Sequence, residues 1–268
     1  MPPDAAPEAS NGASPDDHRL AADLAHATGR LLVDLRERLV ADGASPERIR
    51  AEGDRRANAL LLDALAERAP GDAVLSEEAE GSHDAATRER LDAERLWVVD
   101  PLDGTNEYGD PARGDWGVHV ALVIRHQPVA AAVTLPAQRF LFTTDPPPAP
   151  PPPGPVVPRI LVSRTRRPAF ADALADRLGG VVNQMGSAGA KAMSVVLGAA
   201  DIYVHDSGMY EWDSAAPVAV ARAAGLHTSR LDGTPLAYNN PEPRMPDLLI
   251  CRPEWAPRVL ATLPDLAR

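Results

Sequence analysis

The sequence predicts a mixed fold of helices and strands in two halves, an α+β half followed by an α/β half. Helical leucine spacing persists to about residue 68, and the short apolar runs typical of strands begin at Ala73. After residue 158, strand-like and helix-like segments alternate, which is typical of α/β proteins. A proline-rich stretch at 145–158 separates these two patterns and marks the boundary of the halves.

Length and composition limit the classes of function. With 268 residues, 44% of them hydrophobic, the chain can bury one large core or two modest ones. The formal net charge is −11 and no Lys/Arg stripe offsets it, so we expect no nucleic-acid or membrane partner. Cys251 is the single cysteine, which excludes an internal disulfide and fits a reducing compartment. We therefore expect a soluble, cytoplasmic protein.

The first half is predicted to contain two helices and then five strands. Residues 1–16 are acidic and are expected to form a disordered tail, and residues 17–145 form the first half. The first helix is expected to start near Asp16, and the second to run from Asp54 to Arg68. The expected strands, of which the last three can form an antiparallel meander, are 73–75, 96–99, 116–124, 129–135 and 139–143.

The proline-rich stretch and the second half follow. Proline lacks an amide hydrogen and fixes φ, so residues 146–158 are predicted to be a solvated linker or loop. A docking site for a proline-binding partner is the alternative. Residues 159–268 form the second half. Its expected strands are 160–162, 200–204 and 247–251, and its expected helices are 168–178, 188–197 and 213–224.

The stretch WVVDPLDGT, residues 97–105, concentrates polar groups at the end of a buried strand. Pro101 favours extended geometry for Asp100, which places that carboxylate at the strand end. Asp103 follows one turn later, and Gly104 permits a backbone conformation that other residues avoid. Thr105 can cap a following helix. Carboxylates attract a hard cation and free helical amides attract a phosphate, although a simple Asp-Pro turn is the structural alternative.

Two further carboxylates follow strands in the same way. Glu77 comes after the strand 73–75, and Asp213 follows a strand and the Gly208 turn before an apolar helix. Each has a structural alternative as a helix cap. Together they place several carboxylates at strand ends.

These motifs resemble the inositol monophosphatase superfamily. The chain has the motifs of this superfamily in the same order and spacing: a Glu-Glu strand end, then D-P-x-D-G-T, then W-D-x-A-A about a hundred residues later. The resemblance covers nearly the whole chain after the tail. It implies a layered αβαβα sandwich. The stretches GDAVLSEEA, DWGVHVAL, GSAGAKAM and SRLDGTPLAYN look closest to the branch of 3′(2′),5′-bisphosphate nucleotidases. That branch implies hydrolysis of the 3′-phosphate of 3′-phosphoadenosine 5′-phosphate to AMP, sensitivity to lithium, and a possible homodimer.

The resemblance assigns roles to the candidate residues. It implies two to three Mg²⁺ ions, with these metal ligands: Glu77, Asp100, the Leu102 carbonyl, Asp103 and Asp213. The backbone amides of Gly104 and Thr105 are expected to receive the phosphate, with Asp103 and Asp213 also touching the substrate. Asp54 is expected to pair with Thr105 to activate the attacking water, and Glu77 to assist catalysis.

Charge counting supports a metal site. Four carboxylates at one place carry a charge of about −4, which is untenable unless they are protonated or filled with cations. Three Mg²⁺ ions would leave about +2, which matches a phosphate dianion. One metal would lower the pKa of the attacking water while a second stabilises the leaving oxygen.

Departures from the family pattern concern the water-activating pair. The family usually has a threonine three residues before the helix aspartate, whereas Arg50-Ala51-Glu52-Gly53 precedes Asp54 here. Tyr108 stands where phenylalanine is common, and the proline-rich insert has no counterpart. A binding module that holds metal and nucleotide without catalysis is therefore the competing class of function.

The substrate is less determined than the reaction. Ser187 and Lys191, in GSAGAKAM, occupy a segment that contacts substrate in nucleotide-specific relatives, and Lys191 can pair with a second phosphate. A helix cap and a surface lysine are the structural alternatives, and inositol or another sugar or nucleotide monophosphate is the alternative substrate. The segment fails the P-loop spacing. No histidine shows metal-ligand spacing, so His119 and His205 are expected to be structural or exposed.

Overall fold

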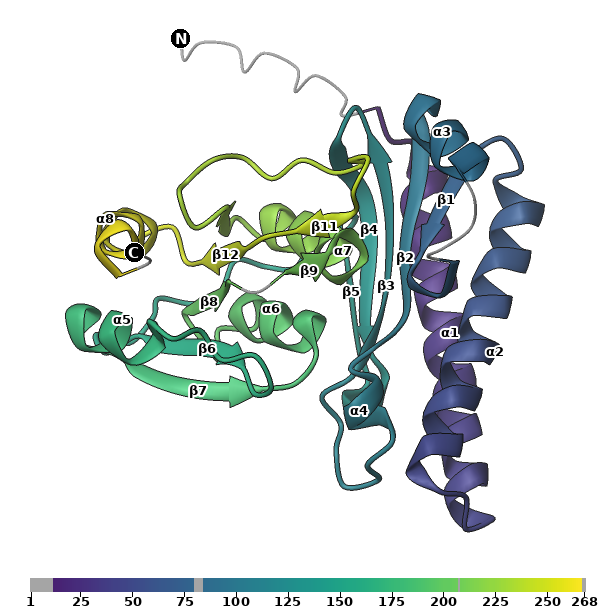
Figure 1. Cartoon of the computed structure of the whole chain (residues 1–268), viewed down its shortest axis with the longest axis horizontal. Helices are drawn as coiled ribbons and strands as arrows, with labels where there is room; N and C mark the ends of the chain where they lie inside the picture. The colour runs from purple at the N-terminus through teal and green to yellow at the C-terminus, as the bar shows by residue number, and fades with distance from the viewer. Residues whose placement is uncertain (1–11, 80–83, 207, 267–268) are drawn as a thin grey trace, which may run out of the picture.

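The structure is a computed structural model that describes residues 12–79, 84–206 and 208–266. Five layers of helices and sheets stack across the molecule (Figure 1). Two long helices cover one face of the first sheet, two helices lie between the sheets, and two more cover the outer face of the second sheet. The predicted αβαβα sandwich is therefore confirmed. Among the described residues, no helix is long and apolar enough to cross a membrane.

The first layer consists of α1, Pro15–Ala41, and α2, Pro46–Arg68. The side chain of Ser14 caps α1, so the helix begins one residue before the predicted end of the tail at residue 16. Residues 1–11 of that tail lie outside the described part of the chain. The predicted start of α2 at Asp54 is wrong, because Ser45 caps the helix and Pro46 occupies its first position.

The first sheet has the order β1-β2-β3-β4-β5. β1 pairs parallel with β2, and the other neighbours are antiparallel, as the predicted meander requires. Its strands are Ala73–Ser76, Arg95–Asp103, Gly117–Ile124, Gln127–Leu135 and Phe140–Thr143. Two short α-helices interrupt this half, α3 at Asp84–Asp92 and α4 at Thr105–Tyr108. A 3-10 turn at Glu77–Ala79 follows β1, and a second one at Pro136–Gln138 joins β4 to β5.

The second sheet has the order β10-β12-β8-β6-β7. Its strands are His227–Ser229, Leu248–Cys251, Ile202–His205, Arg159–Ser163 and Val181–Met185. Between the sheets lie α6, Ala188–Val196, and α7, Glu211–Ala223; outside lie α5, Ala171–Leu178, and α8, Ala256–Leu266. Two short strands, β9 at Met209–Tyr210 and β11 at Arg244–Met245, pair beside α7.

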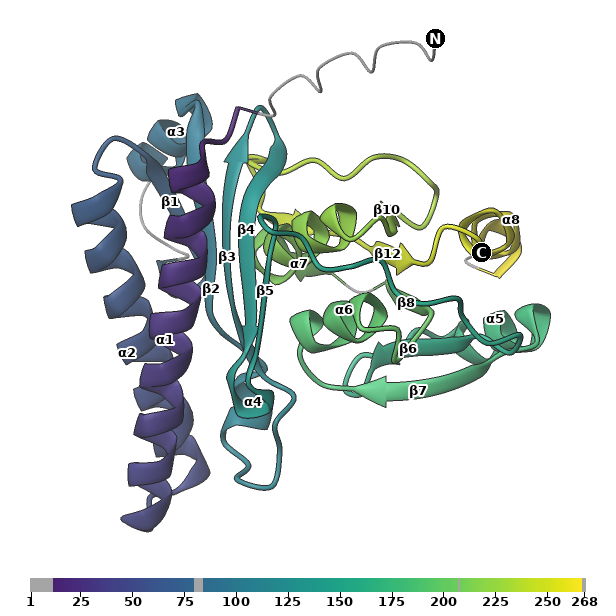
Figure 2. The ribbon, with the colours of Figure 1, turned by 180° about the vertical axis from the view of Figure 1, so that it is seen from behind.

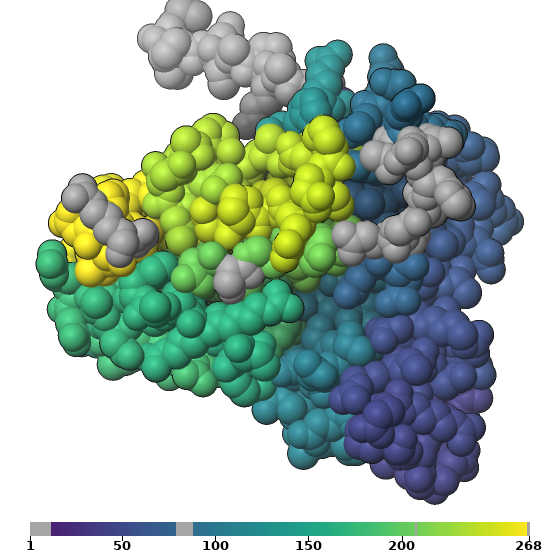
Figure 3. Space-filling view, viewed as in Figure 1, coloured from purple at the N-terminus to yellow at the C-terminus, as the bar shows by residue number. Residues whose placement is uncertain are grey.

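Each pair of adjacent layers shares an apolar core. One core joins α1 and α2 to the first sheet, a second joins both sheets through α6 and α7, and a third joins the second sheet to α5 and α8. Cys251 is buried in the third core, as expected. The two halves are in direct contact along the face shown in the space-filling view (Figure 3).

The proline-rich segment has no regular secondary structure between residues 144 and 158, as predicted. Figure 2 shows it crossing from the end of β5 to the second sheet. Two contacts attach it to the second half: Arg252 donates to the carbonyl oxygen of Pro152 at 2.5 Å, and the amide of Val181 donates to that of Pro158 at 2.9 Å. Arg252 is itself held by the fully buried Asp201, at 2.8 Å, which also pairs with Arg159. The segment is thus attached to the second half at both points.

Candidate active site

A bulge at the end of β2 brings two aspartates to the same face of the first sheet. Asp100 pairs with His119 of β3, and Asp103 pairs with Gly117. Between these two pairs the chain advances three residues on β2 but only two on β3. In a regular strand, residues three apart would point to opposite faces. The extra residue re-aims Asp103, and Pro101 is tolerated there because a bulge does not need its amide.

The carboxylates of Asp100, Asp103 and Asp213 converge at this point. Their oxygen atoms lie within 4.8 Å of one another, close enough to hold a metal ion. Asp213 comes from the first turn of α7, where it also accepts a hydrogen bond from the amide of Tyr210 at 2.7 Å. Glu77, just after β1, lies beside Asp100, whose pKa its charge raises, and completes the four predicted carboxylates.

The electrostatics of this cluster demand cations or protons. Burial, together with the neighbouring carboxylates, raises the pKa of Glu77 to about 7 and that of Asp213 to about 6. The pKa of the fully buried Asp100 is raised well above its usual value, by burial first and by Glu77 next. Hard oxygen ligands at this spacing suit Mg²⁺, and the charge of the ion would remove the repulsion that raises these pKa values. The donor set therefore fits the implied metal.

Asp103 differs from its neighbours because hydrogen-bond donors surround it. Ser187 donates its hydroxyl to this carboxylate, and the amides of Ala188 and Gly189 donate at 3.0 and 2.7 Å. The Nε2 atom of His119 lies 3.2 Å from the same carboxylate. Burial alone would raise the pKa of Asp103, but the charge of His119, the hydrogen bond from Ser187 and the charge of Lys191 hold it below its usual value.

The predicted water-activating pair is also close together. The hydroxyl of Thr105 lies 3.4 Å from the Asp54 carboxylate and 3.1 Å from the carbonyl oxygen of Leu102. Asp54 projects from the middle of α2, and burial followed by the charge of Glu78 raises its pKa to about 7. The expectation that Thr105 caps α4 is wrong. Gly104 occupies the cap position, with φ at 85°, and Thr105 is the first helical residue.

A small cavity of about 110 Å³ opens beside Asp103 and Asp213. Both Ser187 and Lys191 line it, but Lys191 is buried rather than on the surface. Its ammonium donates to the carbonyl oxygens of Gly186 and Ser187, at 2.6 and 2.7 Å. Burial lowers the pKa of Lys191 to about 8.

Sequence reasoning missed two residues near this cavity. Arg166, an exposed cation in the loop after β6, lines it, and the same strand-end logic that selected Asp100 could have found it. His119 was expected to be structural or exposed; it is fully buried and contacts Asp103. Only the register of β3 against β2 reveals this, because His119 lies opposite Asp100 and shares its face.

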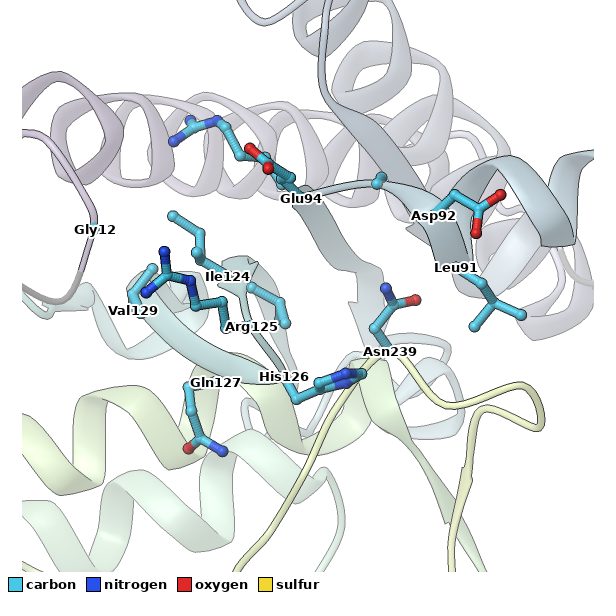
Figure 4. A pocket seen from close by; sticks show the side chains of 13 residues that line it. Gly12, Leu91, Asp92, Glu94, Ile124, Arg125, His126, Gln127, Val129 and Asn239 are labelled. Carbon is cyan, nitrogen blue, oxygen red and sulfur yellow. The ribbon is translucent and has the colours of Figure 1, made fainter.

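A larger cavity, of about 890 Å³, lies away from the acidic cluster (Figure 4). It is lined by the end of α3, the start of β2, the β3–β4 turn and Asn239. Figure 4 shows Arg125 and His126 on that turn and Asp92 and Glu94 across the hollow. None of the four predicted metal carboxylates lines it. The acidic cluster is therefore the candidate active site despite its smaller cavity.

Comparison with curated proteins gives close relatives. The 3′-phosphoadenosine 5′-phosphate phosphatase of Mycobacterium leprae (strain TN) is 45% identical over 262 residues, covering 93% of this chain and 94% of that protein. The protein of the same name from Mycobacterium bovis is 46% identical over 248 residues, covering 90% of each chain. The 3′(2′),5′-bisphosphate nucleotidase CysQ of Escherichia coli (strain K12) is 29% identical, covering 68% of this chain and 76% of that protein.

Solved structures and a family model agree with these relatives. The inositol monophosphatase from Anabaena (Nostoc) sp. PCC 7120 has the same fold, with a TM-score of 0.74, 21% identity, and coverage of 93% of this chain and 95% of that one. The model of the inositol monophosphatase family matches residues 18–147 and 150–267, so within the proline-rich segment it leaves out only residues 148–149. The protein that carries this acidic cluster belongs to the inositol monophosphatase family.

Proposed function

We propose that this protein is a Mg²⁺-dependent phosphomonoesterase that converts 3′-phosphoadenosine 5′-phosphate to AMP and phosphate. The observation that carries the proposal is the identity of 45% to the Mycobacterium leprae enzyme across nearly the full length of both chains. The acidic cluster and the Asp54–Thr105 pair supply the groups that this reaction requires. We also propose a cytoplasmic location, a homodimer and inhibition by lithium, which are properties implied by the family resemblance.

Metal binding is assigned to the buried carboxylates. Two to three Mg²⁺ ions would be held by Glu77, the Leu102 carbonyl and the three clustered aspartates: Asp100, Asp103 and Asp213. When bound, they supply positive charge that lowers the pKa of the attacking water and stabilises the leaving oxygen. The four carboxylates hold no proton in that state, because metal binding requires the ionised form.

Proton transfer is assigned to Thr105 and Asp54. The Thr105 hydroxyl has one proton, and ionised Asp54 draws that proton toward itself and away from the Leu102 carbonyl. The oxygen of Thr105 is then free to accept a proton from the water. With a pKa near 7, Asp54 can take up the transferred proton at neutral pH.

Substrate binding is assigned to both halves of the protein. The amides of Gly104 and Thr105 would receive the phosphate that is cleaved, with Asp103 and Asp213 beside it. Ser187 and Lys191 line the adjacent cavity, and Arg166 brings an exposed guanidinium to it. Arginine binds a phosphate with two parallel N–H groups, so we assign the second phosphate of the substrate to Arg166 together with Lys191.

The direct test is phosphate release from three substrates in parallel: 3′-phosphoadenosine 5′-phosphate, inositol 1-phosphate and fructose 1,6-bisphosphate. We expect release to be fastest from the adenosine bisphosphate, to require Mg²⁺ and to stop in EDTA and in Asp103→Asn. A preference for a sugar phosphate would keep the reaction and overturn the substrate. No release from any of the three would favour the non-catalytic binding module.

Arg166→Gln tests the assignment of the second phosphate. We expect KM for the adenosine bisphosphate to rise about tenfold or more, and KM for inositol 1-phosphate to stay unchanged, because only the first substrate has a second phosphate. Arg167→Gln is the matched control, since Arg167 is the next residue and pairs with the exposed Asp172. Equal effects on both substrates would contradict the assignment.

A further inference from the structure

His119 is a fully buried side chain with both ring nitrogens directed at the candidate active site. Its Nδ1 atom lies 3.1 Å from the carbonyl oxygen of Trp212, and its Nε2 atom lies 3.2 Å from Asp103. A carbonyl oxygen only accepts, so Nδ1 carries the proton in the contact with Trp212. The imidazole therefore spans the distance from the end of β2 to the first turn of α7.

Those two elements carry the clustered aspartates. Asp100 and Asp103 end β2, whereas Asp213 directly follows Trp212 in α7. A side chain that contacts both elements fixes the distance between the carboxylates. Because no backbone hydrogen bond of the first sheet reaches α7 among the described residues, this link depends on side chains such as His119.

The start of α6 is shaped around the same imidazole. Gly189 donates its amide to Asp103 at 2.7 Å, and a Cβ atom at this position would lie 2.1 Å from Nε2 of His119. No real Cβ atom fits at that distance, so only glycine allows α6 to approach. His119, Gly189 and Asp103 are thus packed as one unit.

Filling space in the core would not require a histidine. A buried polar ring is costly unless its nitrogens have partners, and an aliphatic side chain would fill a core position without that cost. Here Nδ1 contacts the Trp212 carbonyl oxygen, and Nε2, which has no partner with hydrogen-bond geometry among the described residues, lies 3.2 Å from the Asp103 carboxylate. This placement is typical of the outer groups that orient metal ligands.

We propose that His119 is a positioning residue that fixes Asp103 relative to Asp213 and thereby sets the affinity of the site for Mg²⁺. The inference rests on the proposed function, since it needs a metal at the acidic cluster. In this role His119 acts on the metal through Asp103. Its substitution should therefore change metal binding more than it changes the stability of the metal-free protein.

The experiment compares thermal unfolding in EDTA with unfolding in Mg²⁺ for the full chain, together with calorimetric titration by MgCl₂. A ligand that binds the native state raises Tm by an increment that depends on its affinity. We expect His119→Leu to bind Mg²⁺ roughly 10- to 100-fold more weakly and to lose most of this increment. His119→Gln, whose amide can donate to Asp103, should recover part of it.

Two further variants separate positioning from stability. Gly189→Ala should displace the imidazole and reduce the Mg²⁺ increment in the same way, even if His119→Leu fails to fold. Leu174→Ala, at a fully buried position in the third core, should lower Tm equally with and without Mg²⁺. If Mg²⁺ raises Tm of both His119→Leu and Gly189→Ala as much as it raises Tm of the wild-type protein, the positioning role of His119 is overturned, whereas the proposed metal site is not. A wild-type protein that does not respond to Mg²⁺ would overturn it together with the proposed metal site.

Discussion

Asp54 depends on its immediate neighbours for the charge state that the reaction needs. Burial and Glu78 raise its pKa to about 7, while the hydrogen bond from Thr105 and the charge of Arg50 lower it. Arg50 lies one helical turn before Asp54, within the stretch that departs from the family pattern. The stretch that lacks the usual threonine thus contributes a cation. This argues that the departure adjusts the base and does not disable it.

Arg50→Gln tests whether the charge of Arg50 acts on Asp54. Loss of the positive charge disfavours the ionised carboxylate, so the pKa of Asp54 rises and the acidic limb of the kcat profile moves to higher pH. Activity below about pH 7 should fall several-fold, with little change at high pH. Arg55→Gln is the control, since Arg55 pairs with Glu52 on the exposed side of α2. An unchanged limb in Arg50→Gln would show that this charge does not act on the base.

Substitutions of Asp54 and Thr105 test whether the two residues act together in one proton transfer. Asp54→Asn should lower kcat by about 10²- to 10⁴-fold, because an amide cannot accept the proton that Thr105 passes on. Thr105→Val should have a similar effect, and the double variant should be hardly worse than either one, since both residues serve a single transfer. Steady-state kinetics with saturating Mg²⁺ measures all three. Additive losses would mean that the two residues act in separate steps.

At the scale of elements, the turn between β2 and α4 is the most demanding piece of backbone in the site. Gly104 has a φ of 85°, and a Cβ atom there would lie 3.1 Å from both the carbonyl oxygen of Asp115 and the side chain of Ser187. Left-handed backbone disfavours residues with a side chain, and the close neighbours would have to move for a Cβ atom to fit. The turn therefore lies where the two halves are in close contact.

Gly104→Ala is the prediction for this element. We expect the free energy of unfolding to fall by roughly 1–3 kcal/mol and phosphate release to fall at least tenfold, because the residue must move away from Asp115 and Ser187. Gly43→Ala separates backbone strain from crowding. Gly43 has a φ of 70° with no atom near its Cβ position, so this control should cost about 1 kcal/mol and keep full activity. Equal activity of Gly104→Ala and Gly43→Ala would show that the contacts of Gly104 with Asp115 and Ser187 do not matter for the reaction.

Much of this element structure could be predicted from the sequence, but the contacts between elements could not. The strand ends that carry Glu77 and Asp100 follow from apolar runs and turn residues, which are local signals. The start of α2 at Pro46 also has a local signal, since Ser45 and Pro46 are typical of a helix N-terminus. The prediction placed the start at Asp54 because it relied on leucine spacing, which weakens before that residue. The role of His119 depends on strand register, and the burial of Lys191 depends on the packing of α6. Neither has a local signature.

At the scale of the whole molecule, the candidate site joins the two halves. Glu77, Asp100 and Asp103 come from the first half, while Asp213 and the amides around Asp103 come from the second. A second link lies nearby, since Glu107 of α4 pairs with Arg164 after β6 at 2.9 Å. The buried carboxylates therefore affect the stability of the folded chain as well as catalysis.

The stability of the metal-free protein should fall as the pH rises. Asp54 and Glu77 have pKa values raised to about 7 and Asp213 to about 6, whereas carboxyls in the unfolded chain titrate near pH 4. Between about pH 4 and 7 the folded protein thus binds more protons than the unfolded one, and its free energy of unfolding decreases. Mg²⁺ binds the ionised carboxylates, so the increase in Tm that it causes should grow over the same range.

Thermal unfolding from about pH 5 to about pH 8, in EDTA and in Mg²⁺, measures both effects. Each kcal/mol corresponds to roughly 2 °C or more in Tm. Asp100→Asn is the informative variant, because it removes a buried carboxyl group whose pKa is raised by burial and by Glu77. It should raise Tm in EDTA near pH 8 and abolish the response to Mg²⁺, which would show that the acidic cluster costs stability in exchange for metal binding. A Tm in EDTA that rises toward pH 8 in the wild-type protein would contradict this account of the cluster.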